Sequence, residues 1–275
     1  VVYGASRDLL GLIAPGGERT KELHIPPYRG ILSEPQNLTV ADLDADGVAS
    51  IVVGVRSWQY LAYSSSLELE WRNVIYAHSA TVAEVADLDG DGTKETVAGN
   101  AYFRLNVINS DGTRRIVAGR FGPEQSAVTS ADLDGDGQRE ILIGTDAGDL
   151  LTFDLDGRKL WERNAGDRVT SVAVVEIGGQ PTVVAASESG HVWAFDGTGK
   201  PRWCTTLGEP VRRLIPSGDT LVCAASGTGV VVLSSSGEIL NVATPRAAAT
   251  DIVVLGDQCA VQLADGSVCG VALKQ

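Results

Sequence analysis

The sequence contains no methionine, only three histidines and few aromatic residues, which make up 5% of its 275 residues. It also contains no apolar run approaching the length of about 20 residues that a membrane-spanning helix requires. Translated chains normally begin with methionine, so we expect Val1 to follow a processed or excised start, with no signal peptide remaining. The lack of long apolar runs argues against insertion into a membrane.

Positive charge is also scarce. The chain has 22 lysines and arginines against 35 aspartates and glutamates, which gives a formal net charge of −13 at pH 7. A surface of this sign repels the phosphates of nucleic acids and the headgroups of anionic lipids. We therefore expect neither to be a partner. The length allows one large all-β domain or two smaller domains, each with a sizeable core.

Recognisable catalytic motifs are absent as well. The sequence has no G-x-S-x-G, no H-E-x-x-H and no glycine-rich loop of the kind that binds phosphate. The three histidines, His24, His78 and His191, occupy unrelated positions in the repeats described below. We therefore predict that the chain is not an enzyme, with no catalytic residues and no organic cofactor.

The four cysteines all lie in the last third of the chain, and their spacing matches neither a zinc site nor a C-x-x-C redox motif. They are Cys204, Cys223, Cys259 and Cys269. Buried thiols and disulfides both remain open. A two-residue turn at Asp265-Gly266 would pair Cys259 with Ala272 rather than with Cys269, which argues against a simple bridge between these two cysteines.

The most informative stretch is residues 132–140, which reads D-x-D-x-D-G-x-x-E. In an extended strand the three aspartates would share one face and repel each other. A tight loop around a hard cation removes that repulsion. Calcium takes six to eight oxygen ligands at about 2.3–2.6 Å, and a glycine allows the sharp bend that such a loop requires. The stretch therefore predicts a calcium-binding loop.

The same loop occurs three times. Residues 87–95 repeat it in full, and residues 42–47 repeat its first part, so the first aspartates are 45 residues apart both times. A solvated acidic turn would explain one copy but not a regular repeat. Ser50 stands at the ninth position of the first copy, where the others have glutamate. We expect this first loop to bind a cation least tightly.

Short apolar runs bounded by glycine turns surround these loops, with about four runs per 45 residues and no helical period. Four strands in about 45 residues is the size of a propeller blade. We predict an all-β fold, a single β-propeller over residues 1–275, with seven blades favoured and six as the alternative. The blades start near residues 1, 37, 82, 127, 169, 209 and 248, and the first and last are partial. Calcium-loop blades span about 37–168 and loop-less blades about 169–275.

Three tryptophans recur at one place in the repeat, Trp71, Trp161 and Trp203. They could stack on a ligand. The favoured interpretation is that each outer strand packs a large side chain against the neighbouring blade.

Residues 37–145, with the motifs Asp87–Glu95 and Asp132–Glu140, resemble the FG-GAP and VCBS repeats of integrin-type and microbial cell-surface propellers. The segments from Gly148 to Trp161 and from Gly190 to Trp203 resemble PQQ-like (quinoprotein-type) propeller repeats, without an identifiable site for the quinone. The FG-GAP resemblance implies up to three bound calcium ions. It implies these ligands, the seventh of each loop through its backbone carbonyl: Asp42, Asp44, Asp46 and Val48; Asp87, Asp89, Asp91, Thr93 and Glu95; Asp132, Asp134, Asp136, Gln138 and Glu140.

From these observations we expect a non-catalytic, calcium-stabilised module that binds a protein or a glycan outside the cell or at its surface, with the periplasm as an alternative location. A structural subunit of a larger surface assembly, with other chains as partners, is the second hypothesis. A propeller enzyme, such as a polysaccharide lyase or a quinone-dependent oxidoreductase, is the third, since this fold hosts both classes.

Overall fold

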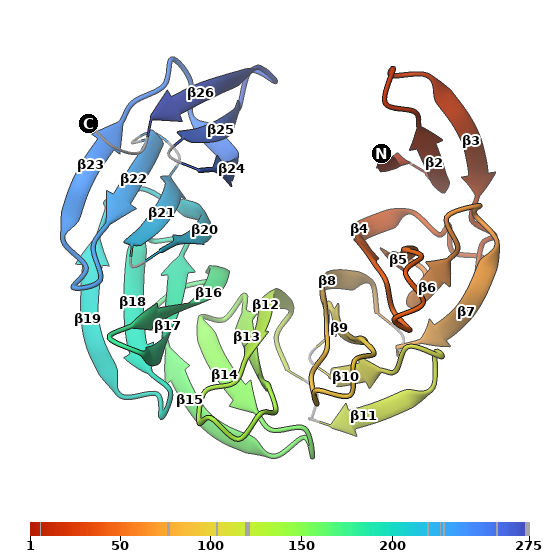
Figure 1. Cartoon of the computed structure of the whole chain (residues 1–275), viewed down its shortest axis with the longest axis horizontal. Coiled ribbons are helices and arrows are strands. Elements are labelled where there is room, and N and C mark those ends of the chain that lie inside the picture. The colour runs from red at the N-terminus through yellow and green to blue at the C-terminus, as the bar shows by residue number, and fades with distance from the viewer. Residues whose placement is uncertain are drawn as a thin grey trace. The chain divides into compact units, whose positions relative to one another are not determined.

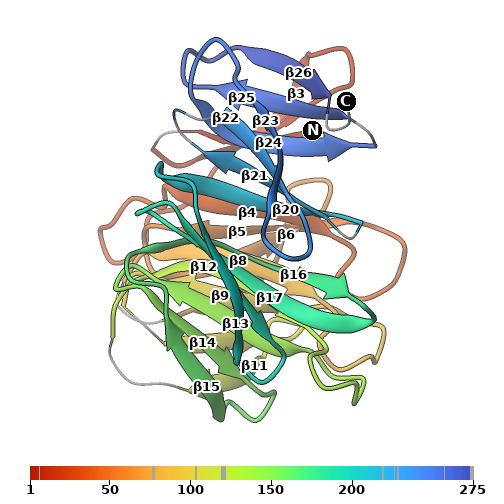
Figure 2. The same cartoon turned by 90° about the vertical axis from the view of Figure 1, so that its left-hand side faces the viewer.

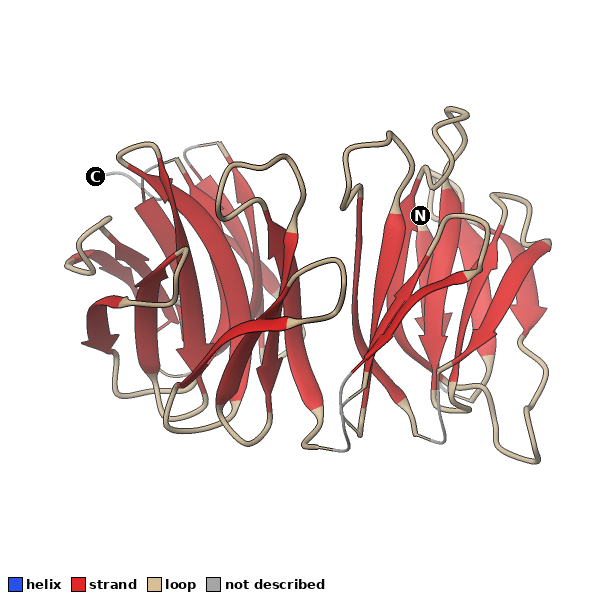
Figure 3. Cartoon of the chain, turned by 90° about the horizontal axis from the view of Figure 1, so that it is seen from below, coloured by secondary structure: helices blue, strands red, loops and turns tan. Residues whose placement is uncertain are grey.

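The computed structural model describes residues 1–5, 7–75, 78–102, 104–118, 122–218, 220–225, 227, 229–256 and 258–272. All regular elements in these residues are strands, and they form seven sheets (Figures 1 and 3). Five sheets have four strands and two have three. Within the described ranges there is no helix of the length and hydropathy that a membrane span requires. The predicted all-β class is confirmed.

Residue contacts divide the chain into two compact units, of which unit 1 comprises residues 1–128 and 155–158. It contains three sheets. The first has β1 (Val2–Ala5), β2 (Leu9–Ile13) and β3 (Arg19–His24); the second has β4 (Pro35–Ala41), β5 (Ser50–Val55), β6 (Gln59–Tyr63) and β7 (Leu69–Val74); the third has β8 (Ala80–Ala86), β9 (Glu95–Asn100), β10 (Leu105–Ile108) and β11 (Arg114–Ala118).

Unit 2 comprises residues 129–154 and 159–275. It holds most of the fourth sheet, β12 (Gln125–Ala131), β13 (Glu140–Thr145), β14 (Asp149–Phe153) and β15 (Lys159–Asn164). The fifth sheet has β16 (Val169–Ile177), β17 (Gln180–Ser187), β18 (His191–Asp196) and β19 (Pro201–Thr206); the sixth has β20 (Val211–Ser217), β21 (Thr220–Ala225), β22 (Gly229–Leu233) and β23 (Ile239–Ala243); the seventh has β24 (Ala249–Leu255), β25 (Gln258–Leu263) and β26 (Val268–Ala272).

The sheets begin where the sequence repeat places them. Their first strands start at residues 2, 35, 80, 125, 169, 211 and 249, within two residues of every predicted blade start. The first and last sheets are the two partial ones, as predicted. The closure of the sheets into one ring of blades and the assignment of both units to a single domain stay predictions.

Neighbouring sheets within each unit pack face to face. In unit 1, β4 contacts β8 (Figure 1). An apolar cluster that includes Val52, Tyr60 and Ile108 packs between the second and third sheets. In unit 2, β16 contacts β20 and β20 contacts β24 (Figure 2). A strand covered on both faces needs no polar side, which is why β5 and β13 are buried along their whole length.

The repeated tryptophans take part in this packing, as the favoured interpretation predicted. Trp161 and Trp203 lie against the turns at Gly199 and Gly237 of the following sheets, so closely that a Cβ on Gly199 would lie 2.7 Å from Cδ2 of Trp161. Their indole nitrogens donate to backbone carbonyls in the same turns, at 2.9 Å each. Trp71 also packs on the following turn, at Gly112 in unit 1, but its indole nitrogen has no described acceptor.

The turn at Asp265-Gly266 corrects one prediction. Cys259 lies opposite Val271 and not opposite Ala272, because three residues rather than two form the turn. Gly266 takes a φ of +81° and donates its N–H to Leu263, the three-residue hairpin geometry that a glycine permits. All four cysteines are free thiols, and burial raises the pKa of the Cys223 thiol to about 12.

Candidate metal centre

The three acidic loops join the first strand to the second in three consecutive sheets. The first connects β4 to β5, the second connects β8 to β9, and the third connects β12 to β13. The ninth position of each loop is the first residue of the following strand, namely Ser50, Glu95 and Glu140. The structure thus places all the predicted ligands at the same corner of their sheets.

The first aspartate holds each loop closed. In the third loop, Asp132 accepts the N–H of Gly135 through Oδ1 at 2.7 Å and that of Gly137 through Oδ2 at 3.1 Å. Asp87 holds the second loop through equivalent bonds, at 2.7 and 3.0 Å. Gly137 has a φ of +89°, a conformation that side chains with a Cβ rarely adopt, and this explains the glycine of the motif.

The aspartate at the fifth position of each loop forms a second small turn. Its Oδ1 accepts the N–H of the seventh residue, at 2.7 Å from Asp46 to Val48 and at 2.8 Å from Asp136 to Gln138. In the second loop Asp91 accepts both the N–H and the hydroxyl of Thr93, and these two bonds hold the pKa of Asp91 below its usual value. These bonds fix the seventh residue close to the carboxylates.

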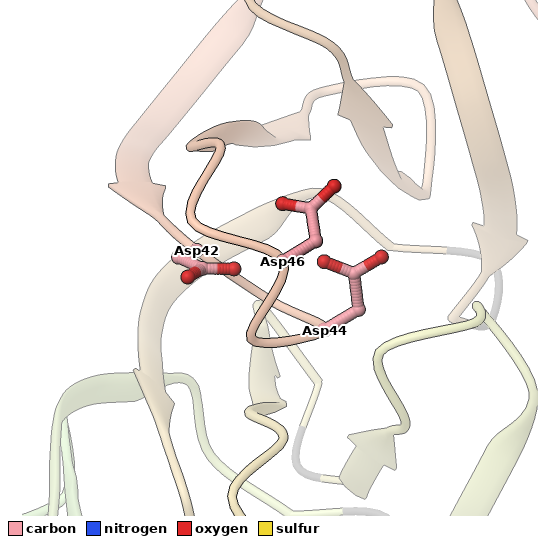
Figure 4. A group of neighbouring side chains, drawn as sticks. All are labelled: Asp42, Asp44 and Asp46. Atoms are coloured by element: carbon pink, nitrogen blue, oxygen red, sulfur yellow. The ribbon is translucent and has the colours of Figure 1, made fainter.

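Each loop brings three carboxylates together, with one oxygen of each lying within 4.8 Å of the others. The clusters are Asp42, Asp44 and Asp46 in the first loop (Figure 4); Asp87, Asp89 and Glu95 in the second; and Asp132, Asp134 and Asp136 in the third. Asp91 and Glu140 were predicted as ligands, but they lie outside these groups of three. Like charges this close repel, and a bound cation would relieve the repulsion.

The two ninth-position glutamates are buried, with Glu95 1% exposed and Glu140 6%. Oε2 of Glu95 accepts the N–H of Leu88 at 3.0 Å, and Oε2 of Glu140 accepts the N–H of Leu133 at 2.7 Å. Burial is the main cause that raises the pKa of both carboxyls, and the neighbouring aspartates of each loop raise it further. An ionised carboxylate in such a position is costly unless a cation is close.

The first loop supplies a direct test of whether the residues suit a metal. Oδ2 of Asp42 accepts the N–H of Gly47 at 3.0 Å, whereas its buried Oδ1 has no hydrogen-bond partner. Ala45 stands where the other loops have the glycine that donates to this oxygen. A buried carboxylate oxygen without a donor, beside two further carboxylates, fits a hard divalent cation. The predicted ligand residues would hold calcium there as an all-oxygen site.

Sequence analysis missed the residues that surround the loops. Nη1 of Arg115, on the outer strand β11, lies 2.6 Å from Oδ2 of Asp89 and 3.8 Å from Oε1 of Glu95. A cavity of about 280 Å³ lies beside the first loop, and Glu70 of β7 lines it together with Asp44 and with Asp111 of the third sheet. An alignment of the outer-strand sequences of the repeats would have shown that Glu70 and Arg115 occupy the same position.

The second residue of each loop was also missed as a structural anchor. Leu43, Leu88 and Leu133 are all buried, at 3%, 0% and 8% exposed. The carbonyl of Leu43 accepts the N–H of Lys94 in the second loop at 2.7 Å, which links the first two loops directly. The D-L-D spelling of all three loops is the signal that could have identified this anchor.

The three histidines each have a local partner. Nδ1 of His24 lies 2.9 Å from Oδ1 of Asp8, and Nδ1 of His191 lies 3.0 Å from Oγ of Ser189. The ring of His78 lies against that of Tyr102, with 4.7 Å between centroids. These are small local contacts at different strands.

No protein-family model matches the sequence, and no curated protein matches it. Many solved structures are similar. Sqt1 of Saccharomyces cerevisiae aligns over 97% of this chain and 79% of its own, with 13% identity and a TM-score of 0.81. BBS1N, solved in complex with ARL6DN, aligns over 100% and 87%, with 14% identity and a TM-score of 0.73. The computationally designed protein Ika8 aligns over 98% and 92%, with 15% identity and a TM-score of 0.71.

These identities are too low to transfer an activity, but the likeness covers nearly the whole chain. Sqt1 and BBS1N are β-propellers. Together with the all-strand sheets, the comparison shows that this chain has the β-propeller fold.

Proposed function

We propose that the chain is a calcium-stabilised propeller of the FG-GAP and VCBS type that serves as a binding module. The observation that carries this proposal is the threefold occurrence of a carboxylate cluster, with oxygens within 4.8 Å, at the same corner of three consecutive sheets. One such cluster is common on protein surfaces. Three at one position of a repeat indicate a shared ligand.

Calcium is the cation that these loops suit best. All the side-chain donors are oxygens, which excludes the softer metals that prefer sulfur and nitrogen. The loops close on themselves through backbone N–H groups and supply several carboxylates in a short span, and calcium accepts such irregular oxygen shells. Magnesium demands a tight octahedron and retains its water, so it binds the loops more weakly.

Calcium also bears on the location. Extracellular calcium modules bind with dissociation constants of about 0.1–1 mM, and such sites fill only where calcium is abundant. We therefore place the protein outside the cell or at its surface.

A protein is the favoured partner. Propellers present loops from a rigid scaffold, and BBS1N was solved in complex with the protein ARL6DN. A glycan partner stays a second possibility for the same module, because carboxylates beside Trp71 line the cavity at the first loop. In this proposal the module has no catalytic role.

The decisive experiment is calorimetric titration of the metal-free protein with calcium, with magnesium as the comparison. We expect up to three calcium sites, and Asp132→Asn should remove one of them. Asp146→Asn is the matched control, because Asp146 is exposed in the turn at the opposite end of β13. If calcium reaches ten times its dissociation constant, each site adds about 1.4 kcal/mol to stability. A melting temperature that is identical in calcium and in chelator would refute the proposal.

A further inference from the structure

The outer strands of the three loop-bearing sheets share one register. The first residue of each outer strand pairs with the last residue of the preceding strand: Leu69 with Tyr63, Arg114 with Ile108, and Lys159 with Phe153. A bulge follows each of these pairs, so that the second residue of the outer strand has no partner. This second residue is therefore structurally equivalent in all three sheets. It is Glu70 in the second sheet, Arg115 in the third and Leu160 in the fourth. One position thus carries a negative, a positive and a neutral side chain.

Arg115 shows where this position points. Its guanidinium contacts the third-position carboxylate Asp89 at 2.6 Å and lies 3.8 Å from the ninth-position carboxylate Glu95. Both acids belong to the cluster that would hold calcium in the second loop. The guanidinium of Arg115 therefore lies close to two carboxylate oxygens that a calcium ion in the second loop would need.

Glu70 occupies the same position beside the first loop. It lines the cavity of about 280 Å³ together with Asp44, Asp46 and Ser50, and the described lining includes no basic side chain. Ser50 stands where the other loops have their ninth-position glutamate, so Glu70 brings a carboxylate to the one loop that lacks it.

Two buried polar atoms near the first loop lack described partners, one in the carboxylate cluster and one in the lining of the cavity. Oδ1 of Asp42 has no donor, and Nε1 of Trp71, a residue that is 9% exposed and lines the cavity, has no acceptor. The equivalent Trp161 and Trp203 both have acceptors for this nitrogen. Buried polar atoms usually have a hydrogen-bond partner, so these two indicate that a ligand can complete the first loop.

We propose that the side chain of the extra residue in the outer-strand bulge sets the cation affinity of its loop: Glu70 supplies the missing carboxylate of the first loop, and Arg115 competes with calcium for the second. This inference rests on the proposed calcium function and deepens it. The loop sequences alone rank the first loop weakest because of Ser50. The outer strands reverse this order and make the second loop the weakest.

The test measures each loop by itself. Asp→Asn changes at the first aspartates of the other two loops leave one functional loop in the full chain, and calcium affinity is then measured by calorimetry. We expect Arg115→Leu to tighten the second loop by roughly threefold to tenfold, and Leu160→Arg to weaken the third loop by a similar factor. Glu70→Gln should weaken the first loop by at least about tenfold.

Arg72→Leu is the matched control for the change in net charge. Arg72 is exposed on β7, and no described ion pair joins it to a loop carboxylate. Circular dichroism confirms that each variant keeps its strands. Calcium affinities that do not respond to Arg115→Leu and Leu160→Arg overturn this inference while leaving the calcium function intact. A protein that binds no calcium in any loop overturns both.

Discussion

Replacing Glu140 by glutamine should have opposite effects with and without calcium. Glu140 is 6% exposed, its Oε2 accepts the N–H of Leu133 at 2.7 Å, and burial together with Asp134 and Asp136 raises the pKa of its carboxyl. At neutral pH the ionised form is therefore unfavourable in the metal-free loop. A glutamine amide oxygen can keep the hydrogen bond to Leu133 without the charge.

The size of both effects follows from this geometry. In chelator, Glu140→Gln should stabilise the protein by about 0.5–1 kcal/mol, since it removes a desolvated charge and retains a hydrogen bond. This raises the melting temperature by about 1–4 °C for a chain of this size. In calcium, the loss of one carboxylate should weaken the third loop at least about tenfold, or about 1.4 kcal/mol. The gain in melting temperature that calcium gives should shrink accordingly.

The assay is thermal unfolding of both proteins, in chelator and in saturating calcium. Glu238→Gln is the control, because Glu238 is exposed in the turn before β23 and far along the chain from any acidic loop. If Glu140→Gln lowers the melting temperature in chelator, the buried carboxylate is favourable without metal and the reasoning fails. An unchanged calcium gain would refute its role at the site.

Three further predictions concern the same loops and the packing around them. In chelator, the free energy of unfolding of the native protein, relative to that of a Glu95→Gln, Glu140→Gln double variant, should fall as pH rises from about 4.5 through the raised pKa of the two carboxyls. The reason is that the folded state binds these two protons more tightly than the unfolded state does. Urea-denaturation midpoints of the two proteins that change in parallel with pH would contradict this. Tyr60→Phe should lower the free energy of unfolding by about 1–3 kcal/mol, because the fully buried hydroxyl of Tyr60 lies within hydrogen-bond distance of the carbonyls of Val82 and Gly99 in the next sheet. Tyr63→Phe is the control, since Tyr63 is on the same strand and has no described hydrogen bond; chemical denaturation should show little change for it. Ala45→Gly should stabilise the first loop by about 1 kcal/mol, because Ala45 has a φ of +62°; a fall in melting temperature would contradict it.

The sequence determined the strands, the sheet boundaries and the acidic loops, because each is encoded locally. Strand runs and glycine turns lie within a few residues of each other, so every predicted blade start falls within two residues of an observed first strand. The D-x-D-x-D-G spacing likewise fixes a loop through short hydrogen bonds, such as that from Gly137 to Asp132. Neither inference needed knowledge of distant contacts.

Sequence reasoning failed where a single residue changes a register. The turn at Gly266 contains three residues and not two, which moved the partner of Cys259 from Ala272 to Val271. Two- and three-residue hairpins both use an Asp-Gly pair, and the choice depends on how the flanking strands pair along their whole length.

Only the tertiary structure decided what surrounds each loop. Arg115 follows Asp89 by 26 residues and reaches it only because the sheet returns its outer strand to the corner where the loop lies. Glu70 comes to the cavity at Asp44 in the same way. A repeat pattern shows that such positions are equivalent, but the distance between a side chain and a carboxylate is set by how the strands pair and fold back on each other.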